Sequence, residues 1–155
     1  MKQERANRES EFASDRLSLG SMEDLLAYRL RSAQYLLFTV HSEVFNRYKI
    51  TPGLYGILIA IRYNPGCSQI AVCNRLNIDS SAMVTALDKL QKLGFVERRP
   101  SPNDRRQRAL YLTEKGEAAM REIETAVATQ EKSLLTDFSA SERTTLMQLL
   151  ERFDR

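Results

Sequence analysis

The chain has 155 residues, which is the usual size of one domain. Its hydrophobic content of 43% is ordinary for a globular protein, and no stretch approaches the roughly 18 consecutive apolar residues that a membrane-spanning helix needs. Residues 1–16 mix both charges and lack the apolar core of a secretory signal, so we expect a cytoplasmic protein without a membrane partner.

The first segment with helical character follows a polar arm. Residues 1–20 are poor in apolar periodicity, which predicts a flexible arm. Ser21 is a plausible N-cap for a first helix over 21–48. That helix has an apolar band broader than one packing partner requires, formed by Leu26, Leu30, Leu37, Val40 and Val44.

Residues 49–113 contain three shorter helices and a hairpin. Thr51-Pro52 begins the first of these helices, and Asn64-Pro65-Gly66 ends it. Ser68 caps the next, for which we expect Ile70, Ala71 and Leu76 to be buried. Asp79 or Ser80 caps a third helix that runs to Leu93, and the residues expected to face inward are Met83, Val84, Leu87 and Leu90. Two short helices joined by a tight turn form a helix-turn-helix, whose second helix normally enters the major groove of DNA.

Two strands and two further helices complete the chain. Gly94 ends the third helix, and residues 95–99 and 109–112 read as strands joined by a proline-containing loop. Thr113 begins a helix, and Ser139 or Ser141 caps the last one, within a C-terminal region of residues 114–155. Both ends of the chain therefore carry helices with surplus apolar surface, which favours a homodimer.

Basic residues are concentrated in one segment. Residues 92–108 hold six basic and two acidic side chains, a net charge of +4, whereas the whole chain carries only +3. Such local clustering beside a helix-turn-helix is typical of a surface that binds double-stranded DNA.

The same segment resembles the MarR family of bacterial winged-helix regulators. The resemblance rests on Asp79 to Leu90, Gly94 to Pro100, Asn103-Asp104-Arg105-Arg106 and Leu112-Thr113-Glu114-Lys115-Gly116. It implies a mainly α fold with a small β-hairpin, in which a winged helix-turn-helix domain is flanked by N- and C-terminal dimerisation helices. It further implies a repressor that binds a pseudo-palindromic operator and is released by a small ligand.

By residue matching, the resemblance implies two sets of site residues. Major-groove or phosphate contacts would come from Ser80, Ser81, Ala82, Thr85 and Lys89. Arg105 would be the wing tip, with Asp104 orienting it, and further phosphate contacts would come from Arg98, Arg99, Arg106 and Arg108. In this family the effector pocket would be lined by Tyr35, Phe38, His41, Phe45, Tyr55 and Ile59. A pocket with several aromatic rings suits an aromatic acid, aldehyde or phenol. Plain packing of these aromatic residues is the alternative.

Other functions have less support in the sequence. The chain has one histidine and no Gly-rich phosphate loop or paired Cys-x-x-Cys, so neither an enzyme, a metal site nor a cofactor is expected. Cys67 and Cys73 leave a thiol-based redox switch open, although neither has an obvious cationic neighbour. An architectural DNA-binding protein without an effector, and a helical protein-interaction module, also remain as alternatives.

Overall fold

The computed structural model describes residues 17–100 and 108–153. The chain divides into two compact units between Leu36 and Leu37. No helix in the described ranges is long and apolar enough to span a bilayer.

The N-terminal unit contains a short 3-10 helix, η1 (Gly20–Asp24), and the first part of α2 (Leu26–Arg47). The prediction of a helix that begins at Met22 with Ser21 as its N-cap is wrong. Leu25 has extended backbone angles (φ −73°, ψ 131°) and separates the two helices, so the regular α-helix starts only at Leu26. The side chains of Leu25, Leu26 and Leu30 are exposed within this unit.

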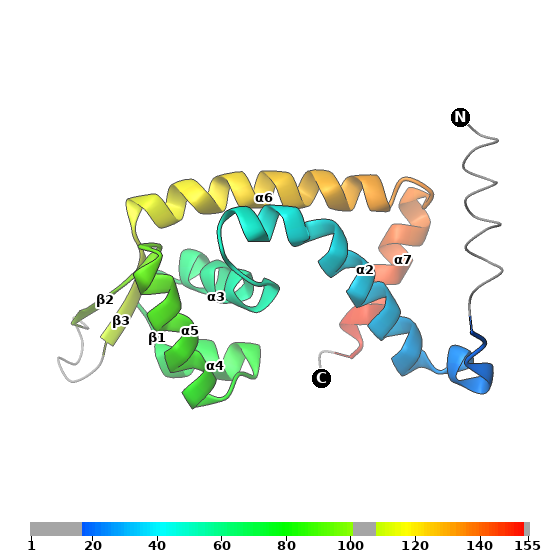
Figure 1. The fold of residues 1–155 in the computed structure, drawn as a ribbon, viewed down its shortest axis with the longest axis horizontal. Helices are drawn as coiled ribbons and strands as arrows, with labels where there is room; N and C mark the ends of the chain where they lie inside the picture. Colours follow the sequence, from blue (N-terminus) through cyan, green and yellow to red (C-terminus); the bar gives the residue numbers. More distant parts are fainter. Residues whose placement is uncertain (1–16, 101–107, 154–155) are drawn as a thin grey trace. The chain divides into compact units, whose positions relative to one another are not determined.

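The second unit contains the rest of α2 and all the other elements. In chain order these are α3 (Pro52–Tyr63), β1 (Cys67–Ser68), α4 (Gln69–Leu76), α5 (Ser80–Lys92), β2 (Val96–Pro100), β3 (Arg108–Leu112), α6 (Glu114–Leu134) and α7 (Ala140–Glu151). This arrangement confirms the expected mainly α fold with a small β-hairpin. Within the unit, α6 passes over α3, and the hairpin lies at the N-terminal end of α6 (Figure 1).

Side-chain caps fix where most of these helices begin. The hydroxyl oxygens of Thr51, Ser68 and Thr113 accept backbone N–H groups at 3.3, 3.2 and 3.0 Å, as the sequence predicted. Asp79, rather than Ser80, caps α5. Ser139, rather than Ser141, caps α7, where it forms a capping box with the residue three positions later.

The sheet has three antiparallel strands in the order β1-β3-β2. In the hairpin Arg98 lies opposite Leu110, and Cys67 pairs with Leu110 from the other side. The two hairpin strands were predicted to within one residue at each end, but β1 was not. It forms where the Gly66 N–H donates to the Leu110 carbonyl at 2.8 Å, and Gly66 supplies the positive φ of 84° that this turn requires.

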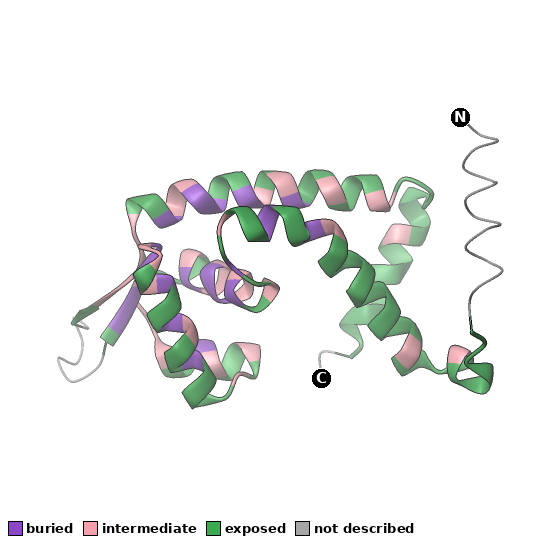
Figure 2. Cartoon of the chain, in the orientation of Figure 1, coloured by how far each residue is buried: buried purple, intermediate pink, exposed green. Residues whose placement is uncertain are grey.

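The core lies between α3, α5, the sheet and α6 (Figure 2). Its fully buried large side chains are Ile57, Leu58, Ile61, Met83, Leu87, Leu90, Leu110, Met120 and Ile123. The prediction that Val84, Ile70 and Ala71 are buried is wrong, because all three side chains are exposed. Val72 supplies the buried side chain of α4 instead. Residues of α7 contribute nothing to this core.

Four interactions join the end of α5 to the start of α6, and we call this region the α5–α6 junction. The Thr113 hydroxyl donates to the Gly94 carbonyl at 2.6 Å, and the Thr113 N–H donates to the Phe95 carbonyl at 3.0 Å. Lys115 Nζ donates to the Leu93 carbonyl at 2.7 Å and lies 5.3 Å from the centroid of the Phe95 ring. The C-terminus of α5 is thus held by side chains of α6.

Candidate nucleic-acid interface

The outer face of α5 is polar and contains small side chains. All five residues that the sequence assigned to base or phosphate contacts on this helix are exposed, namely Ser80, Ser81, Ala82, Thr85 and Lys89. Ser81, Thr85 and Lys89 are spaced by four residues and therefore share one face of the helix. Short side chains on this face allow a close approach to a groove, which is what a recognition helix requires.

The first turn of α5 is organised by Asp79. Its Oδ1 atom accepts the Ser81 N–H at 2.8 Å and the Ser81 hydroxyl at 2.5 Å, and these hydrogen bonds hold the pKa of the Asp79 carboxyl below its usual value. The Thr85 hydroxyl donates to the Ser81 carbonyl at 3.2 Å. The hydroxyl groups of Ser81 and Thr85 are therefore engaged by the N-cap and by the helix backbone.

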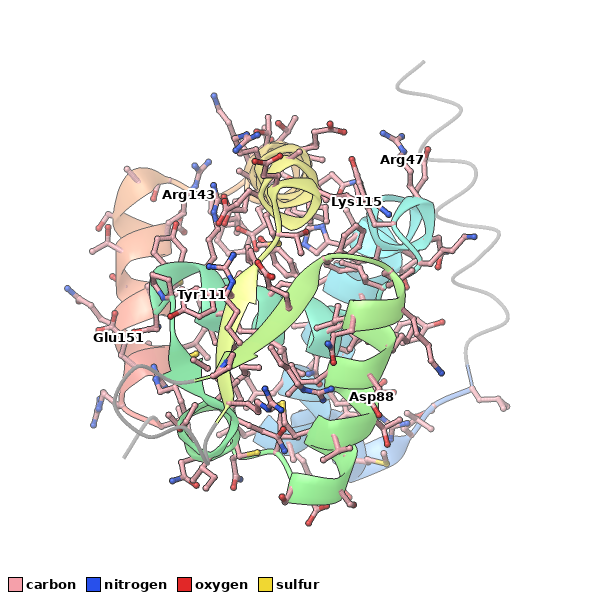
Figure 3. The ribbon with its side chains drawn as sticks, turned by 90° about the vertical axis from the view of Figure 1, so that its left-hand side faces the viewer. Arg47, Asp88, Tyr111, Lys115, Arg143 and Glu151 are labelled. Atoms are coloured by element: carbon pink, nitrogen blue, oxygen red, sulfur yellow. The ribbon has the colours of Figure 1, made fainter. Side chains whose placement is uncertain are left out.

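Arg98 of β2 reaches across to α5. Its Nη1 atom donates to Asp88 Oδ1 at 2.7 Å and to the side-chain oxygen of Gln91, and the Arg98 side chain is only 23% exposed. Figure 3 shows Asp88 on α5. The sequence assigned Arg98 to a phosphate contact, whereas in this structure its guanidinium connects β2 to α5.

Of the three hairpin arginines that the structure describes, Arg99 and Arg108 are more accessible than Arg98. The Arg99 side chain is 57% exposed, and its guanidinium carbon lies 4.8 Å from the centroid of the Tyr111 ring on β3 (Figure 3). A hydrogen bond to Glu97 raises the pKa of Arg99, which keeps it charged. Arg108 is exposed at the start of β3. The predicted wing-tip residues Asp104, Arg105 and Arg106 lie outside the described residues.

Three of the residues assigned to an effector pocket contact one another in the second unit. The Phe45 ring lies 6.0 Å from the His41 ring and 5.3 Å from the Tyr55 ring, measured between centroids. The His41 Nδ1 atom lies 2.8 Å from the side-chain oxygen of Gln130 on α6; because an amide oxygen only accepts, Nδ1 donates this bond. Burial raises the pKa of the Tyr55 hydroxyl. These side chains form a packed aromatic group between α2, α3 and α6.

The other three effector candidates have different environments. Ile59 is half-buried against the core, and Phe38 is exposed on α2. Tyr35 is exposed and belongs to the N-terminal unit. Whether these residues line an effector site remains a prediction.

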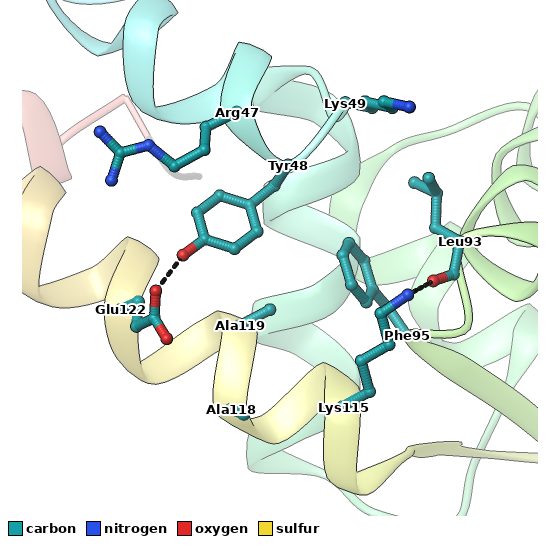
Figure 4. A pocket seen from close by; sticks show the side chains of 9 residues that line it. All are labelled: Arg47, Tyr48, Lys49, Leu93, Phe95, Lys115, Ala118, Ala119 and Glu122. Atoms are coloured by element: carbon teal, nitrogen blue, oxygen red, sulfur yellow. Dashed lines mark hydrogen bonds between the residues drawn. The ribbon is translucent and has the colours of Figure 1, made fainter.

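A cavity that sequence analysis did not identify lies beside the α5–α6 junction (Figure 4). It has a volume of about 410 Å³ and is lined by Arg47, Tyr48, Lys49, Leu93, Phe95, Lys115, Ala118, Ala119 and Glu122. The Tyr48 hydroxyl donates to Glu122, and this bond raises the pKa of Tyr48. Three separate chain segments form this cavity, so no local motif could have revealed it.

The two cysteines, Cys67 and Cys73, are both free thiols. Cys67 and Cys73 are both half-buried, and burial raises the pKa of the Cys67 thiol, which disfavours the reactive thiolate. Among residues 17–100 and 108–153, no three His, Cys, Asp or Glu side chains are grouped so that they could hold a metal ion.

Comparisons with known proteins agree with this geometry. A model described as the MarR family matches residues 48–107. A protein named as the transcriptional regulator for the hcr operon of Thauera aromatica is 37% identical over 137 residues, covering 88% of this chain and 82% of the relative. The solved structure of the transcriptional repressor CouR with a 23-mer DNA duplex has a TM-score of 0.83 and 31% identity, and the match covers 91% of this chain and 100% of that one. CouR bound to p-coumaroyl-CoA has a TM-score of 0.81 and 29% identity, with 90% and 99% covered.

Proposed function

Because this chain belongs to the MarR family of transcriptional regulators, we propose that it is a repressor that binds a pseudo-palindromic operator as a homodimer and is released by a small aromatic effector. The observation that carries this proposal is the outer face of α5, which is polar, built from small side chains and flanked by the exposed arginines of the hairpin. A duplex offers a groove for the helix and phosphates for the arginines.

The homodimer is supported by apolar surface that neither unit buries. In the second unit, α7 exposes Leu146, Leu149 and Leu150. In the N-terminal unit, Leu26 and Leu30 on α2 are exposed as well. Large exposed apolar patches on a protein mark interfaces, and a helix-turn-helix dimer places two reading helices about one DNA turn apart.

The aromatic effector is supported by the group around Phe45 and by the ligand of a relative. CouR, 29% identical, has been solved with p-coumaroyl-CoA, an aromatic acyl thioester. His41 and Tyr55 supply polar atoms beside the Phe45 ring, and such a combination orients an aromatic ligand. We therefore expect the effector to be a hydroxylated aromatic acid or its coenzyme A thioester.

A gel shift with the intergenic region upstream of the gene tests DNA binding, and footprinting then defines the operator. We expect specific binding that weakens as salt is raised. Substitution of the residue predicted to form the wing tip, Arg105→Ala, should weaken binding to all sequences and reduce the slope of log affinity against log salt by about one. Arg121→Ala, which removes an exposed arginine of α6, is the matched control and should change neither quantity. An absent shift at low salt contradicts the regulator proposal.

Release by an effector distinguishes a regulated repressor from an architectural DNA-binding protein. Thermal-shift measurements with p-coumaric acid, simple phenols and p-coumaroyl-CoA should identify a ligand that raises the melting temperature. The same ligand should release the operator in a gel shift, and Tyr55→Phe, which removes only the hydroxyl, should weaken that release. If no compound of these classes releases the operator, the effector part of the proposal fails while the DNA-binding part stands.

A further inference from the structure

One apolar side chain lies on the outer face of α5. Val84 is 43% exposed, whereas the other large hydrophobic residues of this helix, Met83, Leu87 and Leu90, are completely buried. Val84 follows Ser81 by three residues, so it lies on the face assigned to the DNA groove. Single exposed valines are common on protein surfaces. Val84 is of interest because it lies on the face of α5 that is assigned to the DNA groove.

Three of the polar side chains around Val84 are already engaged. The Ser81 hydroxyl donates to the Asp79 carboxylate, and the Thr85 hydroxyl donates to a carbonyl of the same helix. The Asp88 carboxylate accepts a hydrogen bond from Arg98. The middle turn of α5 therefore offers methyl groups in preference to free donors or acceptors.

Only one apolar group is available on the base edges in the major groove, which is the C5-methyl group of thymine. We propose that Val84 recognises the methyl group of a thymine at one position of each operator half-site. Ala82 and the serines beside it are small enough to let the helix approach until the two methyl surfaces touch. This inference rests on the proposed function, because it assumes that α5 enters the groove of an operator.

Replacing thymine by deoxyuridine removes this methyl group and leaves the hydrogen-bonding edge of the base unchanged. Duplexes of the footprinted operator would be made with deoxyuridine at each pair of symmetry-related thymines in turn. At one pair, we expect the affinity of the native protein to fall by about fourfold for each methyl group, or about fifteenfold for the two half-sites. The other pairs should have little effect.

The variant Val84→Ala tests whether Val84 is the residue that contacts this methyl group. This variant should bind the unmodified operator more weakly, and it should no longer distinguish thymine from deoxyuridine at the sensitive position. Because Val84 is exposed, the variant should keep the native melting temperature. Ile70→Ala, which shortens another exposed apolar side chain on α4, is the matched control and should retain the full deoxyuridine penalty.

The outcomes separate this inference from the proposed function. If the native protein binds the thymine operator but no deoxyuridine pair weakens binding, or if the penalty persists in Val84→Ala, the role of Val84 is refuted and the repressor proposal stands. If the native protein does not bind the operator at low salt, the proposed function fails, and the assignment of Val84 fails with it.

Discussion

Gly116 occupies a position in the first turn of α6 where only glycine fits. A Cβ atom there would lie 2.1 Å from the carbonyl oxygen of Phe95. That oxygen also accepts the Thr113 N–H at 3.0 Å, so it cannot move away without breaking the α5–α6 junction. The requirement for glycine at this position is one of space, because the backbone is helical.

We therefore predict that Gly116→Ala destabilises the protein by about 1–3 kcal/mol through overpacking. Gly56 in α3 provides a matched comparison, since a Cβ atom there meets nothing within 4 Å. Gly56→Ala should raise the free energy of unfolding by up to about 1 kcal/mol, because alanine has the higher helix propensity. Urea unfolding of both variants measures the two effects, and effects of the same sign would contradict this account.

At the scale of elements, Arg98 determines how the hairpin meets α5. It lies on β2 and holds Asp88 and Gln91 of α5, so the wing and the reading helix form one connected surface. Arg108 lies on the neighbouring strand and is exposed. The two arginines therefore have different environments on the same hairpin.

This difference predicts different salt dependence of operator binding. Arg98→Gln should lower the affinity at every salt concentration without changing the salt slope, because an internally paired arginine releases no counterions from DNA. Arg108→Gln should reduce the slope by about one. Fluorescence anisotropy over a range of salt concentrations measures both, and an equal loss of slope in Arg98→Gln would show that Arg98 contacts a phosphate instead.

Local signals explain which elements could be predicted from the sequence. Ser68, Asp79 and Thr113 each precede an apolar helical pattern, and their caps act within three residues. The two residues of β1 are too few to show alternation, and they pair with a strand more than 40 residues later. Val84 was misassigned because it lies only about 100° around the helix from the buried Met83, and the sequence does not mark which side of the apolar stripe reaches solvent.

In the candidate site too, features that depend on residues close in sequence could be predicted, and contacts between separate elements could not. The polar face of α5 could be predicted because its residues lie within one helix and recur at helical spacing. The connection from Arg98 to Asp88 could not, because it joins residues ten positions apart on different elements. The Phe45 group joins three helices, so its aromatic residues could be found by their type but their contacts could not.

At the scale of the whole molecule, the apolar side chains of α7 are one surface that a single chain leaves exposed. We predict that Leu149→Glu places a charge in the proposed dimer interface and shifts the protein towards monomers. Gln148→Glu adds the same charge at the neighbouring position of the helix and serves as the control. Light scattering after size-exclusion chromatography measures the mass, and a dimer that persists in Leu149→Glu would exclude α7 from the interface.

The α5–α6 junction has a mechanical consequence for such a dimer. Because α6 has 21 residues, it is a rod about 31 Å long that is fixed to the reading helix at one end. A tilt of about 5° around this pivot corresponds to a displacement of about 3 Å at the far end of the rod. In the proposed dimer, two such levers would set the distance between the two copies of α5, which must match one DNA turn of about 34 Å. If the dimer interface holds the far ends of α6, the angle between the two copies of α6 would decide whether both copies of α5 reach the groove together.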